Sequence, residues 1–486
     1  MKADLREKLI SWLPLLTFCL FALQIPMDVL SFWMGRLGMS NLLTLALRLG
    51  VLAVVLLAGF LASGNKKIWW ITAGVLGALF AGHLWAIFDY GVSSLMTDLT
   101  NFVRVVQMPL LTVCLICFMK ENHKCYDAMK WGVATCLWLV FLVQILAILT
   151  GTEPHTYKDG SGYIGWFNNT NSQSNNLCML APVAIALTLK KWGMKHPAFW
   201  LTLAGSVTAM FFLSTRLAYL GLVITTLGLG ISLIFINWRD WKRAIAFFLI
   251  AIVFVGLIPV SPMVTHQNQY ESVQVDRQEG IDQSMKETQP PVEAETTEPP
   301  TQEELMAQKI EKLTWIYEFY IPDFVEIFGL ERTMEMFNYT SDIYQLTMLR
   351  PKKLKFAQML MDDSPFSARL FGLELSRFTV NNNIYDVEND LHGIYYLYGV
   401  AGLAAMLLFL AYFVWLILWA LFKDIRKYFT WDAAAWGIAF LLSAPHIYCT
   451  AGVLRRPSAA IYLAAALAAV YYLVKLKVYE KETVTK

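Results

Sequence analysis

The sequence is poor in charge. Only 16% of its 486 residues are Asp, Glu, Lys or Arg, whereas 57% are hydrophobic and 14% are aromatic. The mean hydropathy is +0.48. This composition excludes a large soluble enzyme and is typical of an integral membrane protein. The formal net charge of +2 argues neither for nor against a polyanionic partner, and we expect no nucleic acid. Only the placement of the charges can indicate a site.

The sequence also lacks a disulfide framework and an obvious signal-peptide cleavage site. Six of the seven cysteines lie in or beside apolar segments, and the seventh lies in a short charged loop. Cys114 and Cys117 form a CxxC pair without a second pair or clustered histidines, so we interpret them as small core residues. We predict no metal site and no cofactor. The N-terminal apolar segment is predicted to be an uncleaved first membrane span.

Apolar segments of about the length that crosses a bilayer recur along the chain. They lie at 9–29, 41–63, 67–88, 103–119, 130–150, 175–190, 197–214, 217–237, 243–262, 393–422, 433–453 and 457–475. The predicted fold is therefore an all-α polytopic membrane protein with about twelve transmembrane helices. Lysines and arginines concentrate in short loops on one side, together with both termini, and the positive-inside rule predicts that this side is cytoplasmic.

Four regions follow from this pattern. Residues 1–262 form a membrane domain of about nine spans, and 393–486 contain the last three spans and a cytoplasmic tail. Between them lies a large extracellular loop. Its first part, 263–305, is rich in Gln, Glu, Thr and Pro, which favours a disordered insertion. Its second part, 306–392, regains apolar periodicity and is predicted to fold as short helices, with 310–330 and 353–361 as candidates.

Several arginines do not follow the positive-inside pattern. Arg216 lies at a tight outer turn, Arg104 begins the fourth span from outside, and Arg455 and Arg456 lie in the last outer turn. One interpretation is that these side chains extend to the membrane interface. The other is an anion site at the outer face, because a guanidinium matches phosphate oxygens in bidentate geometry.

A polar cluster precedes the tenth span. Glu388, Asp390 and His392 stand directly before an apolar helix. Burying charge is costly unless it is paired or left near water. The cluster is therefore either an ordinary helix border, where an acid favours the helix dipole, or a site at the membrane surface.

Four segments, in order, resemble the O-antigen ligase and polymerase family of integral membrane glycosyltransferases. GWFNNTNSQSNN is similar to a Gly-aromatic-Phe, Pro-Asn segment, with Thr170 in place of the usual Pro before Asn171. STRLAYLGL is similar to the family's Ser-Arg turn. LRPKKLKFAQMLMDDSPFSARLFG resembles the loop segment in which an arginine, here Arg350, begins an amphipathic helix that is followed by Pro365 and Gly372.

The fourth segment is the polar cluster itself. The family's ligases have a His-Asn pair eleven residues before a GxxG, and counting back from Gly399 gives Glu388 and Asn389. Glutamate thus replaces the ligase histidine. This departure resembles a Glu-x-Asp form associated with Gram-positive members. His392 is four residues beyond Glu388, so the two side chains would share a face in a helix.

The resemblance implies the reaction and its participants. The donor would be a glycan on polyprenyl pyrophosphate, the acceptor a glycan or lipid-linked glycan, and the location the outer face of a bacterial cytoplasmic membrane. Arg216 and Arg350 would stabilise the pyrophosphate and Glu388 would act as general base, with Asp390 in the same catalytic group. The expected substrate-binding residues are Asn171, Arg377, His392, Arg104 and Arg455.

Three alternatives remain at this point. Glu388 and Asp390 could hold a magnesium ion beside the pyrophosphate. The chain could be a lipid-linked oligosaccharide flippase or another polytopic transporter, although no half of the sequence repeats in the other. It could also be a sensor or scaffold, in which case Arg216 would be dispensable.

Overall fold

The computed structural model describes residues 3–40, 42–152, 154–287, 301, 310 and 313–477. The elements before the large loop are α1 (Ala3–Ala22), α2 (Gln24–Arg36), α3 (Leu42–Ala62), α4 (Lys67–Tyr90), α5 (Leu95–Glu121), α6 (Lys124–Thr150), α7 (Thr170–Trp192), α8 (Pro197–Phe212), α9 (Arg216–Ile236), η1 (Trp238–Asp240), α10 (Trp241–Gly256) and η2 (Ile258–Val260). The remaining elements are α11 (Pro262–Glu287), α13 (Pro322–Phe328), α14 (Leu330–Met336), α15 (Ile343–Thr347), α16 (Leu349–Asp362), α17 (Phe366–Phe371), η3 (Leu375–Phe378), β1 (Thr379–Val380), β2 (Asn383–Ile384), α18 (Asp390–Tyr428), α19 (Trp431–Cys449), α20 (Pro457–Tyr471) and η4 (Tyr472–Leu476).

The predicted all-α membrane class is confirmed. Eight described helices are long and apolar enough to cross a bilayer: Asp4–Arg36, which joins α1 and α2, Leu42–Ala62, Lys67–Tyr90, Leu95–Glu121, Lys124–Thr150, Arg216–Ile236, Asp390–Tyr428 and Pro457–Leu476. The other four predicted spans coincide with α7, α8, α10 and α19, and α8 and α10 have only 16 residues each. The count of twelve therefore stays a prediction. In the described residues the only sheet is the small antiparallel pair of β1 and β2.

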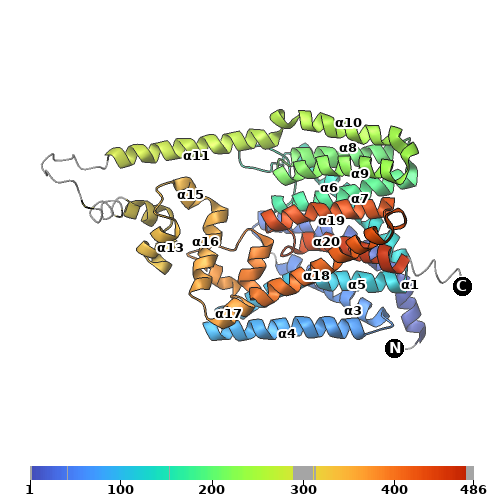
Figure 1. The fold of residues 1–486 in the computed structure, drawn as a ribbon, viewed down its shortest axis with the longest axis horizontal. Helices are drawn as coiled ribbons and strands as arrows, with labels where there is room; N and C mark the ends of the chain where they lie inside the picture. Colours follow the sequence, from blue (N-terminus) through green and yellow to red (C-terminus); the bar gives the residue numbers. More distant parts are fainter. Residues whose placement is uncertain are drawn as a thin grey trace.

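The helices lie side by side along the long axis of the molecule (Figure 1). The segment from α11 to α17 gathers at one end of this bundle, and the start of α1 lies at the opposite end (Figure 1). This arrangement agrees with a large loop and an N-terminus on different sides of a membrane. Which end faces the cytoplasm stays a prediction.

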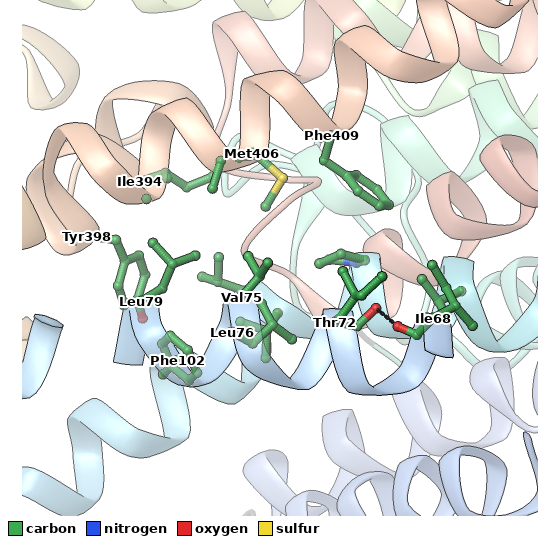
Figure 2. A pocket seen from close by; sticks show the side chains of 17 residues that line it. Ile68, Thr72, Val75, Leu76, Leu79, Phe102, Ile394, Tyr398, Met406 and Phe409 are labelled. Atoms are coloured by element: carbon green, nitrogen blue, oxygen red, sulfur yellow. Dashed lines mark hydrogen bonds between the residues drawn. The ribbon is translucent and has the colours of Figure 1, made fainter. Parts of the chain in front are cut away.

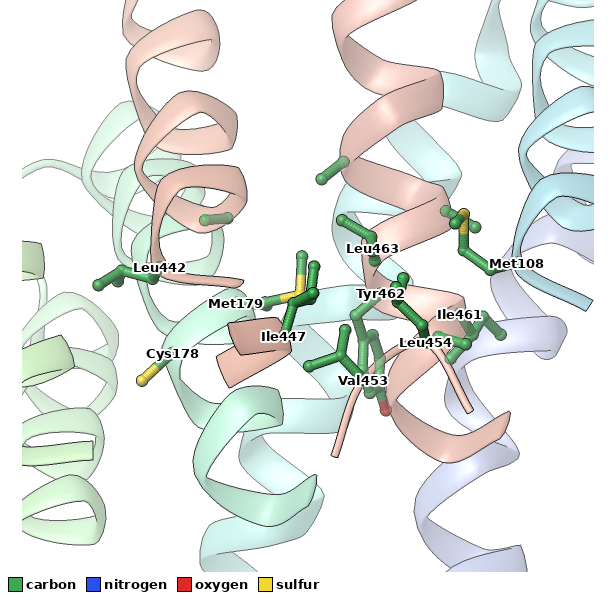
Figure 3. Packing of buried hydrophobic residues seen from close by; sticks show 14 of the residues in the cluster. Met108, Cys178, Met179, Leu442, Ile447, Val453, Leu454, Ile461, Tyr462 and Leu463 are labelled. Atoms are coloured by element: carbon green, nitrogen blue, oxygen red, sulfur yellow. The ribbon is translucent and has the colours of Figure 1, made fainter. Parts of the chain in front are cut away.

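The centre of the bundle is formed by α7, α19 and α20, which pack against one another. Met179 of α7 and Ile447 of α19 approach Val453 and Tyr462 in this core (Figure 3). Helix α20 is rich in alanine, and its residues from Ala459 to Ala469 are almost fully buried. Small side chains let neighbouring helix backbones approach closely, which is how membrane helices gain packing energy. This rigid core supports the turn between α19 and α20.

Two glycines fix the loop region to the membrane helices. Gly372 has φ +92°, and a Cβ there would lie 2.2 Å from the backbone carbon of Leu397. Gly399 has φ +65°, and a Cβ there would lie 2.3 Å from the backbone of Leu370. Both positions need glycine, because the conformation is unfavourable for L-residues and the backbones touch. Helix α18 bends at Gly399, so the loop packs directly into the bend.

A buried hydrogen-bonded pair adds to this attachment. His83 of α4 bonds Asp98 of α5 at 2.7 Å, and its other ring nitrogen bonds the carbonyl of Phe371 at 2.8 Å. Because a carbonyl only accepts, the nitrogen facing Phe371 carries a proton. The Asp98 carboxylate also accepts from the backbone N–H of Leu375 at 3.3 Å. The loop segment is thus tied to both α4 and α5.

The structure differs from the sequence prediction in the first part of the loop. Composition favoured disorder over 263–305, but residues 262–287 form helix α11. Pro262 stands at the first position of the helix, where its missing N–H costs nothing. The segment up to residue 287 contains no further proline, and its Gln and Glu residues have good helix propensity. Residues 288–300 and 302–309 lie outside the described part of the chain. The short helices predicted at 310–330 and 353–361 are present as helical residues 313–320, α13 and α16.

Candidate functional site

Glu388 lies on an extended segment that leads into α18. Asn389 is the N-cap of this helix: its side chain accepts a hydrogen bond from the His392 backbone N–H at 3.0 Å and donates to the carbonyl of Tyr448. Since N-cap residues have non-helical backbone angles, Glu388 stands outside the helix. The expectation that Glu388 and His392 share a helical face is therefore wrong.

The Glu388 carboxylate faces two cations of α16. Lys353 Nζ lies 2.8 Å from one carboxylate oxygen and Arg350 Nε lies 3.6 Å from the other. Arg350 and Lys353 are three residues apart, so they lie on one face of the helix. Phe356 and Leu360, in the later turns of the same helix, are buried in the loop core. Burial of these apolar residues holds the cations toward Glu388.

Arg216 begins α9, and Thr215 before it is the N-cap. The guanidinium is exposed, and among the described residues it has no carboxylate partner. The charges of Arg216 and Arg350 both act on the Tyr157 phenol. Burial and the Asp159 carboxylate raise the pKa of the Tyr157 phenol, whereas the charges of Arg350 and Arg216 act to lower it. The loop tyrosine thus lies within electrostatic reach of both arginines that the resemblance assigned to pyrophosphate.

A polar chain lies behind the Arg216 turn. Thr215 donates to the Ser174 hydroxyl at 3.0 Å, and Ser174 lies 2.9 Å from His446 Nε2. His446 Nδ1 bonds the carbonyl of Leu442 at 2.9 Å. Because the carbonyl only accepts, Nδ1 carries the proton and Nε2 accepts from Ser174. The direction of the chain is fixed, and it orients the turn that presents Arg216.

The contacts of Asp390 indicate a structural role. It is fully buried, and one oxygen accepts from the backbone N–H groups of Val453 and Leu454, each at 2.9 Å. Arg455 Nε lies 3.6 Å from the other oxygen. Arg455 is itself buried and pairs with Asp386 at 2.5 Å. These contacts join the start of α18 to the turn between α19 and α20, and they direct Asp390 away from an ion site shared with Glu388.

Of the other predicted substrate-binding residues, Arg377 makes structural contacts, whereas His392 and Asn171 lie near the starts of helices. Arg377 donates to the carbonyls of Tyr90 and Gly91 at 2.8 and 2.7 Å and stacks on the Tyr90 ring, so it holds η3 against α4. His392 is exposed one turn into α18, and Asn171 is the second residue of α7, partly buried. Thr170 occupies the first helical position, where proline is also favoured.

Arg104 does not join the group around Glu388. It lies on α5, and the cations whose charges act on it are Arg456 and Arg48. The structure therefore pairs Glu388 with Arg350 and Lys353, puts Arg350 and Arg216 within electrostatic reach of Tyr157, and places Arg104 in a different set.

Two residues of the site were missed from sequence. Lys353 could have been found, because it lies three residues after Arg350 on the predicted amphipathic helix. Tyr157 gave no signal, since a tyrosine in a polar loop has no pattern that distinguishes it. Among the described residues, no group of three or more His, Cys, Asp or Glu side chains could hold a metal ion.

An apolar pocket of about 260 Å³ lies between α4, α5 and α18. Figure 2 shows Tyr398 and Phe102 at one end and Ile68 with Thr72 at the other. No Asp, Glu, Lys, Arg or His lines it. The pocket can accommodate a hydrocarbon chain but carries no group for catalysis.

The fold and the charged face define a class: a polytopic membrane protein with a folded loop that places cations and a carboxylate beside the end of a helical bundle. The sequence model of the family described as "O-antigen ligase like membrane protein" matches residues 11–479. The chain therefore belongs to this family, which supports a role in glycan assembly at a membrane and a glycosyltransferase-like activity. A search of the curated proteins finds no match.

Proposed function

We propose that this protein is a glycosyltransferase of surface polysaccharide assembly, acting at the outer face of a bacterial cytoplasmic membrane. It polymerises or ligates glycan from a polyprenyl pyrophosphate carrier. The observation that supports this proposal is the convergence of Arg350 and Lys353 on Glu388, with the charges of Arg350 and Arg216 both acting on Tyr157. A fixed set of cations next to a carboxylate is what this transfer requires.

The reaction breaks the bond between the anomeric carbon of the donor sugar and the pyrophosphate oxygen. A new bond forms from the same carbon to a hydroxyl oxygen of the acceptor. The bonding electrons leave with polyprenyl pyrophosphate, whose added negative charge Arg216 and Arg350 stabilise. Glu388 takes the proton of the acceptor hydroxyl.

The ion pairs suggest an order of events. Without substrate, Glu388 is held by Lys353 and more loosely by Arg350. A bound pyrophosphate offers Arg350 a doubly charged partner in place of a single carboxylate oxygen. Arg350 then moves to the phosphate, and Glu388 keeps one cation while its second oxygen becomes free to accept a proton. Substrate binding thus exposes the base.

The test is complementation of a deletion strain with Glu388→Gln and Arg216→Ala. Removing a general base costs about 10²- to 10⁴-fold in rate, and removing a charge-stabilising donor about 10²- to 10³-fold. We expect loss of long-chain polysaccharide and accumulation of lipid-linked units, at normal membrane levels of each variant.

Matched controls lie in the same loop. Glu331 is exposed, and Arg332 forms an exposed pair with Asp363. Glu331→Gln and Arg332→Ala should therefore leave polymer unchanged. Normal polymer from both site variants would contradict the proposal and favour transport or scaffolding.

A further inference from the structure

A buried carboxylate in the loop collects three hydrogen-bond donors from the chain that leads to Glu388. Asp323, the second residue of α13, is 3% exposed. One of its oxygens accepts from the Tyr385 hydroxyl at 2.5 Å and from the Asn383 amide at 2.8 Å. The other oxygen accepts from the Asn381 amide at 3.1 Å. Tyr385 lies three residues before Glu388, so this cluster holds the chain just before the proposed base.

The three donors keep Asp323 charged. Burial acts to raise the pKa of its carboxyl, but the hydrogen bonds from these side chains outweigh burial, and the pKa lies below the ordinary 3.8. Hydrogen bonds to an ionised acceptor are stronger than those to a neutral one. The cluster is therefore a strong attachment between α13 and the segment 381–385.

The turn between β1 and β2 directs the chain into this cluster. Asn381 and Asn382 both have positive φ, +48° and +66°, and Val380 pairs with Asn383 across them. Two successive residues with positive φ are what a type I′ hairpin turn requires, and asparagine adopts this conformation more readily than most residues. The turn thus fixes the path along which the chain returns toward Tyr385.

Tyr385 and Glu388 attach the same segment to one helix. The Tyr385 ring stacks on Phe356 of α16, with 4.2 Å between the ring centroids and 15° between the planes. The Glu388 carboxylate lies 2.8 Å from Lys353 Nζ of the same helix. Lys353 and Phe356 are three residues apart, so they are neighbours on the surface of α16. The two contacts form one interface, which is apolar at Tyr385 and ionic at Glu388.

The bundle holds the other end of this segment. Asp386 pairs with Arg455 at 2.5 Å, and Asp390 is fixed by the turn between α19 and α20. Glu388 stands between these anchors, and its ion pairs are with cations of α16. The place of its carboxylate is thus set by the bundle on one side and by Tyr385 on the other.

We propose that Tyr385 and Asp323 are positioning residues for Glu388. The bond between them fixes the Tyr385 ring against Phe356, and this contact holds the Glu388 carboxylate where an acceptor hydroxyl can reach it. The inference rests on the proposed function and adds a requirement to it, because the base must be held by the loop core as well as by the cations of α16. A general base acts within about 2.6–3.2 Å of the group that it deprotonates, and a misplacement of about 1 Å can cost about 10²-fold in rate.

The test compares two variants that each lose one buried hydroxyl of the loop. Tyr385→Phe keeps the ring and loses the bond to Asp323. Thr333→Val, the matched control, loses a hydroxyl that donates to the Gly329 carbonyl at 2.7 Å and lies outside the segment 385–389. Each variant is induced in the deletion strain, and the conversion of accumulated lipid-linked units to polymer is timed at equal membrane levels. We expect the rate to fall about tenfold in Tyr385→Phe, because the base is partly misplaced, and to stay unchanged in Thr333→Val.

Two further readouts separate positioning from a general loosening of the loop. Hydrogen exchange of residues 386–389 in the purified protein should be faster in Tyr385→Phe and unchanged in Thr333→Val. In a Glu388→Gln background, Tyr385→Phe should cost no further rate, because the base that it positions is already absent. A further loss of rate there, or faster exchange throughout the loop, would overturn the positioning role.

The outcomes also distinguish this inference from the proposed function. A wild-type rate in Tyr385→Phe, with the rate lost in Glu388→Gln, would overturn the positioning role alone. A wild-type rate in Glu388→Gln would overturn the proposed function, and the positioning role with it. If Tyr385→Phe does not accumulate in the membrane, Asp323→Asn takes its place. Its amide oxygen still accepts from Tyr385 but as a weaker neutral bond, so we expect a smaller loss of rate, and a wild-type rate would equally overturn the positioning role.

Discussion

Replacing Asp390 separates a structural role from a catalytic one. In Asp390→Ala, the backbone N–H groups of Val453 and Leu454 lose their buried acceptor, and Arg455 loses one of its two carboxylates. Breaking a buried charged pair by removing one partner costs about 3–5 kcal/mol. Arg455 keeps Asp386 at 2.5 Å, so we expect the lower end, about 3 kcal/mol of the free energy of unfolding.

Asp390→Asn is the matched variant. The amide oxygen can still accept from both N–H groups, and only the charge is lost. Hydrogen bonds to charged groups contribute about 1.5–3 kcal/mol, whereas neutral ones contribute about 0.5–1.5 kcal/mol. The expected loss is therefore about 1–2 kcal/mol.

The assay combines thermal unfolding of the purified protein in detergent with polymer formation in cells. We expect Asp390→Ala to unfold at a clearly lower temperature, and Asp390→Asn to keep most of both stability and polymer. A stable Asp390→Asn protein without polymer would refute the structural interpretation and return Asp390 to the catalytic group. Wild-type stability of Asp390→Ala would refute the energetic reasoning.

Two further outcomes are expected. Gly372→Ala should destabilise the protein by about 2 kcal/mol or more, because φ is +92° and its Cβ would meet the Leu397 backbone; Gly437→Ala, with no atom within 4 Å of a Cβ, should not lower the melting temperature. At Asp159, burial acts to raise the carboxyl pKa, but hydrogen bonds from Ser161 and His266 lower it to about 2, below the ordinary 3.8. The contribution of the ionised Asp159 to stability is therefore present above pH 4 and lost as the pH falls toward 2. Hydrogen exchange of the loop around Ser161, corrected for intrinsic rates, should show this loss. Asp159→Asn should abolish the pH dependence.

Local contacts explain which parts of the site could be predicted. Arg350 was found because an arginine at the start of an amphipathic helix is a readable pattern, and the same periodicity could have given Lys353. Arg455, like Arg216, is an arginine near an expected span end, and Arg377 is an arginine in the expected outer loop. Their partners are Asp386, Tyr90 and Gly91, which are far away in sequence. No local pattern can tell a paired arginine from an exposed one.

The sequence by itself determined the membrane class, the position of the large loop and the family, because apolar runs and ordered motifs are local properties of the chain. The N-cap at Asn389 is also a local interaction, because the capping residue is adjacent to the helix that it caps. Only the tertiary structure decided that Asp390 is held by the turn between α19 and α20, while Glu388, two residues earlier, faces Lys353. The start of α18 turns one carboxylate inward and leaves the other at the loop interface, and burial in a folded bundle depends on segments that meet only in space.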